Sequence, residues 1–303
     1  MASYSIKDLE FLSGIKAHTI RVWEQRYNIL CPKRTETNIR YYLDEDLKHL
    51  LNVSLLYEHN YKISAIAKMA LDDLNEKVQE IAESHTSKHT NLNALMVAMM
   101  EMDEDRFEKV LSTHILQNGF EQTIINLVYP FLEKIGILWR IESINPAHEH
   151  FISNLIRQKI IVAIDGQINP EMAGAKKYLL FLPEYELHEI GLLFSNFLIK
   201  SRNQKVVYLG TSVPLEDVKK VYDIHKPDYI FSIFSANPGS EQLQDYVNFL
   251  ANNFAEATVL LTGWQALNNQ YEVPANVKLI KNLDELIDFV EQNRVYTMNL
   301  ENS

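Results

Sequence analysis

The apolar positions of the first 71 residues recur at helical spacing, and turn residues divide them into short segments. Residues 6–13 form the first predicted helix, because Ser5 and Asp8 at its start have the spacing of a capping box. Gly14 is placed to end this helix. Residues 17–27 form the second predicted helix.

A basic hairpin is predicted directly after these two helices. Residues 33–42 alternate around a polar turn, which puts Arg34 and Arg40 on the two arms of the hairpin. Two short helices and a basic hairpin predict a winged helix-turn-helix over residues 1–71. The polar segment 72–90 has few apolar residues and is predicted to be a fraying helix and a linker.

The rest of the chain has helical periodicity at first and then an alternation of short apolar runs with helical stretches. Residues 91–172 are helical in periodicity with interruptions near Asp103, Gly119 and Pro146, which predicts a four-helix bundle. Residues 173–293 predict a five-stranded, doubly wound, flavodoxin-like domain, because short apolar runs alternate with helical stretches. The runs are 177–182, 206–209, 228–234, 258–262 and 277–280, and residues 294–303 form a tail. The predicted fold class is therefore multidomain, α and α/β.

Composition narrows the class of protein. Hydrophobic residues make up 47% of the chain and charged residues 23%, so wholesale disorder is excluded. No apolar run reaches the length of about 18 residues that a membrane span needs, and a basic-then-apolar leader is lacking, so a cytoplasmic protein is expected. Cys31 is the only cysteine, which excludes an intramolecular disulfide and a thiolate metal cluster.

The net charge of −11 is unevenly distributed. Residues 1–42 contain seven basic and four acidic side chains. A locally positive head on an acidic body confines any DNA binding to one end of the chain. On this spacing alone, a DNA-binding domain and a small helical domain with solvated arginines are equally good interpretations.

The residues of this head decide between them. The run IRVWEQRYNILCPKR at 20–34, followed by IRYY at 39–42, resembles the MerR family of transcriptional regulators over residues 4–71. Asn38 stands where a glycine often lies in the wing, and asparagine tolerates a positive φ. The resemblance implies a homo-oligomer, dimer or tetramer, on a double-stranded operator of inverted or direct repeats. It implies DNA contacts by Arg21, Arg26, Tyr27, Arg34, Arg40 and Tyr41.

Candidate chemistry gathers at the carboxyl ends of the predicted strands, where doubly wound sheets bind ligands. Glu186 and His188 follow the first strand, Ser232 ends the third and Gly263 follows the fourth. Glu186 would orient the imidazole of His188 as a metal ligand, although a surface histidine beside acidic neighbours is the simpler interpretation. Too few ligands cluster here for a protein-only site, so a metal would arrive inside a cofactor.

The spacing favours the cofactor. Glu186-x-His188-x-x-Gly191, then Ser232-Ile-Phe and Gly263, resembles the signature of cobalamin-binding domains, Asp-x-His-x-x-Gly, Ser-x-Leu and Gly-Gly. The resemblance implies that His188 binds cobalt and that Gly191 and Ser232 line the channel of the displaced nucleotide tail. Glutamate replaces the usual aspartate at 186.

The bundle carries a further motif. Trp139 and, after nine residues, Glu149-His150 span the end of the third bundle helix and the start of the fourth. On their own they suggest a core aromatic and a capping carboxylate. Their spacing resembles the cobalamin-sensing, light-responsive repressors of the MerR type, which implies that Trp139 shields the upper axial group and that Glu149 and His150 bind its adenosyl moiety. Arg140 stands where light-sensing members can have a histidine.

These motifs predict a DNA-binding repressor, not an enzyme, whose oligomeric state and operator binding are controlled by adenosylcobalamin and, where the cofactor is photolysed, by light. Trp264, in place of the second glycine, would narrow the tail pocket or stack on the tail's base. This tryptophan therefore leaves an alternative open, namely a regulator that has lost cobalamin and binds another small molecule or a protein. A corrinoid enzyme subunit is disfavoured by the DNA-binding head.

Overall fold

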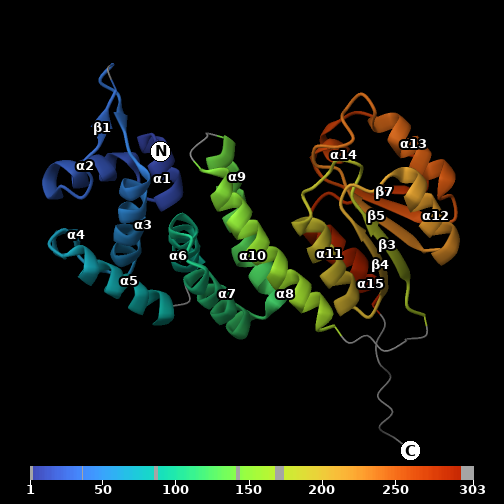
Figure 1. Ribbon diagram of the computed structural model, residues 1–303, viewed down its shortest axis with the longest axis horizontal. Coiled ribbons are helices and arrows are strands. Elements are labelled where there is room, and N and C mark those ends of the chain that lie inside the picture. Colours follow the sequence, from blue (N-terminus) through green and yellow to red (C-terminus); the bar gives the residue numbers. More distant parts are fainter. Residues whose placement is uncertain (1–2, 36, 85–87, 141–143, 168–173, 295–303) are drawn as a thin grey trace, which may run out of the picture. The chain divides into compact units, whose positions relative to one another are not determined.

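The computed structural model describes residues 3–35, 37–84, 88–140, 144–167 and 174–294 (Figure 1). For residues 79–84, 88–90, 137, 139 and 140 it describes the backbone alone. The chain divides into two compact units, Met1–Ile156 and Arg157–Ser303, and each is described by itself. Within the described residues, no helix combines the length and the apolar character needed to span a membrane.

The first unit begins with the predicted winged helix-turn-helix. The Ser5 hydroxyl accepts from the Asp8 N–H, and the Asp8 carboxylate accepts from the Ser5 N–H, so the predicted capping box is present. Gly14, at a φ of 75°, ends the first helix. The elements of this head are α1 (Ile6–Ser13), α2 (Ala17–Tyr27), β1 (Lys33–Arg34), β2 (Arg40–Tyr41), α3 (Asp44–Glu58), α4 (Ile63–Ile66) and α5 (Leu71–Ser84).

The polar segment 72–90 packs more closely than its composition predicts. Most of it belongs to α5, in which Leu74 and Val78 are buried. Asn75 accepts a hydrogen bond of 3.1 Å from Asn52 of α3, so α5 is attached to the head by polar as well as apolar contacts. These two apolar side chains are enough to hold α5 on the head, because α3 offers an apolar face on which they pack.

The remainder of the first unit is helical, with four segments as predicted. They are α6 (Lys88–Glu101), α7 (Glu104–Asn118), the continuous run α8 (Phe120–Thr123), η1 (Ile124–Val128) and α9 (Tyr129–Arg140), and α10 (Pro146–Asp165). The η1 stretch is π-helical and lies just before Pro130, which has no N–H to donate to the preceding turn. The last helix, α10, continues into the second unit.

The second unit is a parallel five-stranded sheet in the order β4-β3-β5-β6-β7. Its elements are β3 (Lys177–Phe181), α11 (Ile190–Ser201), β4 (Lys205–Gly210), α12 (Leu215–His225), β5 (Tyr229–Ile233), α13 (Leu243–Asn253), β6 (Thr258–Thr262), α14 (Trp264–Asn268), β7 (Val277–Leu279) and α15 (Leu283–Gln292). The strand runs and the doubly wound topology agree with the prediction. The order reverses between β3 and β5, which is where such sheets form a ligand crevice.

Helices cover both faces of the sheet. In Figure 1, α11 and α15 lie on one face, and α12 and α13 on the other. On the second face, the side chains of α12 and α13 pack on alternate strand residues, with Val218, Val247 and Leu250 among those fully buried. Because both faces are covered, the interiors of the central strands β3, β5 and β6 are largely buried and apolar, and most of their polar residues lie at the strand ends.

Candidate functional site

The predicted DNA-contacting residues lie on α2 and the wing. Arg21 and Arg26 are exposed on α2, whose other side buries Ile20 and Trp23 in the core of the head. Tyr27 is the last residue of α2 and is half-buried. Two exposed cations on the outer side of a helix are suited to contact with phosphates and base edges.

The wing is built as predicted and carries its arginines on opposite arms. Arg34 pairs with Arg40 across the two strands. Asn38 has a φ of 66°, and its side-chain oxygen accepts a hydrogen bond of 2.7 Å from Arg34 Nη1. The asparagine thus provides the positive φ of the turn and also fixes the guanidinium of Arg34. Tyr41 is half-buried in the second arm.

An internal network connects the wing to α2. Glu24 of α2 accepts a short hydrogen bond from the Tyr42 hydroxyl and lies 3.6 Å from Arg40 Nε in an ion pair. Arg21, Asn38 and Arg40 also line one hollow of 370 Å³ between α1, α2 and the wing. The structure therefore brings Arg21 and Arg40 together, with the guanidinium of Arg40 already engaged by Glu24.

The bundle motif lies at the start of α10. Pro146 begins the helix as predicted. Glu149 accepts a hydrogen bond of 2.6 Å from the Ser153 hydroxyl, and its second oxygen lies 3.2 Å from His150 Nδ1. The His150 side chain is 74% exposed. Trp139 belongs to the last turn of α9, and its side chain lies outside the described part of the chain, as does that of Arg140.

The second group lies at the carboxyl edge of the sheet, on the loop between β3 and α11. The carboxylate of Glu186 is 1% exposed, whereas the side chain of His188 is 75% exposed. Glu186 Oε1 accepts a short hydrogen bond from His188 Nδ1 and bonds of 3.1 Å from the N–H groups of Leu187 and His188. The predicted contact between this carboxylate and the imidazole is present.

The second oxygen of Glu186 is bound by another loop. Glu186 Oε2 accepts from the N–H of Ala236, at 2.7 Å, and from that of Asn237, at 3.4 Å. Burial by itself would raise the pKa of Glu186, but the hydrogen bonds from His188 and from the backbone outweigh it and lower the pKa to about 2. An ionised carboxylate can only accept, so Nδ1 of His188 carries a proton, and in the neutral imidazole the lone pair is then on Nε2.

The small residues of the motif lie where backbone segments approach closely. A Cβ at Gly191 would lie 3.1 Å from Ile233 Cδ1. Gly263 has a φ of 99°, and a Cβ there would lie 2.5 Å from the carbonyl oxygen of Phe234. Ser232 is fully buried, and its hydroxyl donates a hydrogen bond of 2.8 Å to the Phe181 carbonyl. These residues bring the ends of β3, β5 and β6 together.

Sequence reasoning missed several residues that hold the loop 183–189. The Ser212 hydroxyl, after β4, accepts from the Tyr185 N–H at 3.0 Å. Glu189 accepts from the Tyr208 hydroxyl at 2.9 Å and forms an ion pair of 2.7 Å with Arg157 of α10. Ser212 lies just after a parallel strand, which was the one available signal, and this position does not say which residue it contacts.

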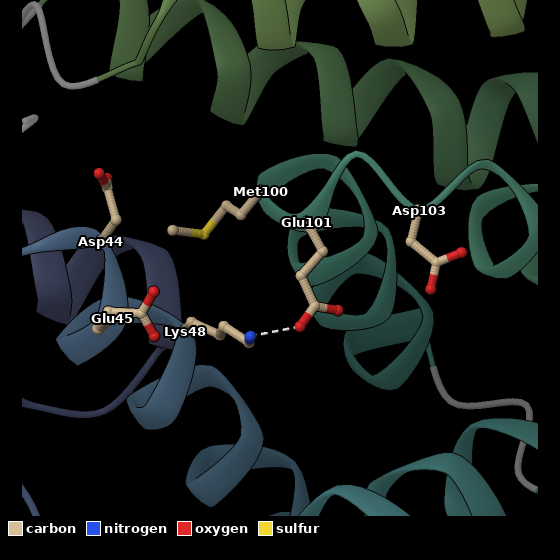
Figure 2. A pocket seen from close by; sticks show the side chains of 6 residues that line it. All are labelled: Asp44, Glu45, Lys48, Met100, Glu101 and Asp103. Atoms are coloured by element: carbon tan, nitrogen blue, oxygen red, sulfur yellow. Dashed lines mark ion pairs between the residues drawn. The ribbon is translucent and has the colours of Figure 1, made fainter.

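A polar hollow of 510 Å³ lies elsewhere in the first unit, between α3 and the α6–α7 corner (Figure 2). Figure 2 shows Lys48 directed toward Glu101, with which it forms an ion pair. Glu101 also pairs with Arg106 at 3.2 Å, and Asp44 accepts from the Tyr4 hydroxyl at 2.8 Å. Because these carboxylates have structural partners, the hollow is a polar junction between helices.

Comparison with known families identifies two parts of the chain. Residues 4–72 match the MerR HTH family regulatory protein family, which covers the head. Residues 92–163 match the B12 binding domain family, which covers the helical segments from α6 into α10.

Individual proteins match over longer stretches. The chain is 26% identical over 278 residues to the HTH-type transcriptional repressor CarH of Myxococcus xanthus, covering 89% of this chain and 92% of that protein. It is 27% identical over 235 residues to the HTH-type transcriptional repressor CarA of the same organism, covering 74% of each. The solved structure of the Methanosarcina barkeri monomethylamine corrinoid protein superposes with a TM-score of 0.49 at 12% identity, covering 74% of this chain and 99% of that one.

Proposed function

We infer that this chain is a DNA-binding transcriptional regulator of the MerR type that binds and responds to cobalamin, and we propose that it acts as a repressor. The relatives that it matches over most of its length are named repressors, which agrees with the prediction of a regulator and not an enzyme. The observation that carries the proposal is the Glu186–His188 pair at the ligand-binding edge of the sheet, in a chain that begins with a winged helix-turn-helix.

The residues of this edge fit a corrinoid. Glu186 fixes the proton of His188 on Nδ1, so Nε2 is the nitrogen that would bind cobalt. In the described part of the chain, no group of three or more histidine, cysteine, aspartate or glutamate side chains is arranged to hold a metal ion. His188 therefore suits a metal whose other ligands come with the cofactor. A bound corrinoid would supply cobalt with a cleavable cobalt–carbon bond.

The start of α10 supports adenosylcobalamin as the effector. We propose that His150 and Glu149 offer hydrogen bonds to the adenosyl group, with Trp139 as an apolar shield. The 3.2 Å contact between Glu149 Oε2 and His150 Nδ1 restrains the exposed His150, and Ser153 restrains Glu149 in turn. A guanidinium has no lone pair for a metal, so Arg140 would not serve as the cobalt ligand that a histidine at this position could provide.

The head supports operator binding through Arg21, Arg26 and the wing. We propose that adenosylcobalamin favours an oligomer that places several heads on one operator of repeated half-sites. The cofactor can favour that state only by its differential affinity, typically about 1–3 kcal/mol of coupling. Multivalency then increases operator occupancy without any new base contact.

A mobility-shift series tests the function. Purified protein is titrated on its own promoter DNA without cofactor, with adenosylcobalamin in the dark, and after illumination, while gel filtration reports the oligomeric state. We expect the cofactor to change both the shift and the elution volume. Identical shifts in all three conditions would contradict cofactor control.

A second titration tests the cobalt ligand. His188→Ala is expected to lose the spectral change that accompanies adenosylcobalamin binding in the dark. His225→Ala, at the exposed end of α12, is the matched control and keeps it. A wild-type spectrum and affinity in His188→Ala would refute the assignment.

A further inference from the structure

Exposed aromatic and apolar side chains lie on two loops at the carboxyl edge of the sheet, one of which carries His188. Tyr185 is 76% exposed and Leu187 is 70% exposed, on the two sides of Glu186 in the loop after β3. Trp264, at the start of α14 after β6, is 63% exposed. Large apolar side chains gathered on a surface are typical of a binding site.

These side chains belong to loops that are joined by hydrogen bonds. Ala236 donates its N–H to Glu186 Oε2, and its carbonyl accepts a hydrogen bond of 3.4 Å from Gln265 Nε2. Glu186, which contacts His188, and Gln265, which follows Trp264, are therefore both hydrogen-bonded to Ala236. Asn237 adds a bond of 3.2 Å from Nδ2 to the Tyr185 carbonyl. Trp264 and His188 thus belong to one connected surface.

The backbone around Trp264 is fixed by its predecessor. Gly263 lies against the backbone of Phe234 with no room for a Cβ, and the Gln265 N–H donates to the Phe234 carbonyl at 2.9 Å. Trp264 is held between these two anchored residues and begins α14. Because its indole is mostly exposed, Trp264 does not fill the interior between the strand ends, and the indole presents an aromatic surface to a ligand.

We propose that Trp264 is a corrinoid-contacting residue that stacks on the aromatic base of the nucleotide tail and makes the site selective for corrinoids that carry such a base. The inference rests on the proposed function, because the base would be available for stacking where His188 supplies a ligand to cobalt in its place. β3 and β6 are two strand spacings apart, about 10 Å, which a corrin ring with its nucleotide arm can span. An indole and a planar base stack favourably whatever the identity of the base.

Two corrinoids separate this contact from the others. Adenosylcobalamin carries the nucleotide, whereas adenosylcobinamide has the same ring, cobalt and upper group without it. In equilibrium titrations in the dark, Trp264→Ala is expected to weaken adenosylcobalamin binding by about tenfold or more and to leave adenosylcobinamide binding unchanged. Trp264→Phe retains an aromatic face and keeps most of the affinity. His188→Ala weakens both corrinoids, because both carry cobalt.

Ile224→Ala is the matched control. Ile224 is 75% exposed near the C-terminus of α12. This end of the helix leads to the start of β5, at the edge of the sheet opposite the site, so the substitution should alter neither titration. Unchanged or tighter cobalamin binding in Trp264→Ala, or equal losses for the two corrinoids, would overturn the inference while leaving the proposed function intact. A wild-type protein that binds neither corrinoid would overturn the proposed function itself.

Discussion

Lys134 of α9 donates a hydrogen bond of 3.0 Å from Nζ to the carbonyl oxygen of Leu12, in the last turn of α1. The carbonyls at the end of a helix carry partial negative charge and lack partners within the helix, so a lysine is a favourable partner there. Burial lowers the pKa of Lys134, and the nearby Glu58 opposes this effect. The contact connects α9, the helix that ends beside Trp139, to the turn that precedes α2.

Replacing this lysine should loosen the head. Lys134→Met keeps the apolar stem and removes the charge, so the Leu12 carbonyl loses a charge-assisted hydrogen bond. We expect a loss of about 1–3 kcal/mol in the free energy of unfolding, measured by urea denaturation. Lys7→Met, at an exposed position of α1, is the control and should stay close to wild type. Equal stability of the two variants would contradict a role for the contact.

Operator binding should depend on Arg21. Arg21→Ala removes an exposed cation from the outer side of α2, next to the wing. We expect binding to weaken by about tenfold and the dependence on salt to decrease, because one phosphate or base contact is lost. Adenosylcobalamin uptake should not change. The measurement is a mobility-shift titration at two salt concentrations, with Lys219→Ala in the sheet unit as control; an unchanged shift would refute the placement of α2.

Gly263→Ala should destabilise the sheet unit. Its Cβ would lie within 3 Å of the Phe234 backbone, and its φ of 99° is unfavourable for any other residue. We expect a loss of about 1–3 kcal/mol, seen as a lower midpoint in chemical denaturation. Gly239→Ala is the matched control, because the nearest atom to its Cβ is the flexible side-chain oxygen of Gln242 at 3.7 Å. Similar losses in both variants would show that the close approach is unimportant.

Stability should fall in mild acid because of His114. This histidine is buried on α7, where its Nδ1 lies 2.9 Å from the Thr123 hydroxyl, and burial lowers its pKa. The folded state then binds fewer protons than the unfolded state, so the free energy of unfolding decreases as the pH falls below about 6.5 toward the folded-state pKa. His114→Gln should flatten this part of the pH profile, measured by denaturation at several pH values. The same change at exposed His18 should not flatten it.

Local patterns were sufficient for most elements of the fold. The Ser5–Asp8 box and Gly14 define α1 through contacts between residues close in sequence, and the strands β3 to β7 are short apolar runs because both faces of the sheet are covered. The same holds for the Glu186–His188 contact, which joins residues two apart. In contrast, the burial of α5 depended on the face of α3, which no pattern within 72–90 contains.

The sequence by itself determined which residue types stand at the sheet edge and in the head, because motif spacing, capping and strand ends are local properties. Only the tertiary structure decided that Glu186 also accepts from Ala236, 50 residues away, that Lys134 reaches Leu12, and that the indole of Trp264 is exposed. These contacts involve backbone groups, which every residue type carries, or the direction of a loop anchored elsewhere. Neither leaves a signal in the order of side chains along the chain.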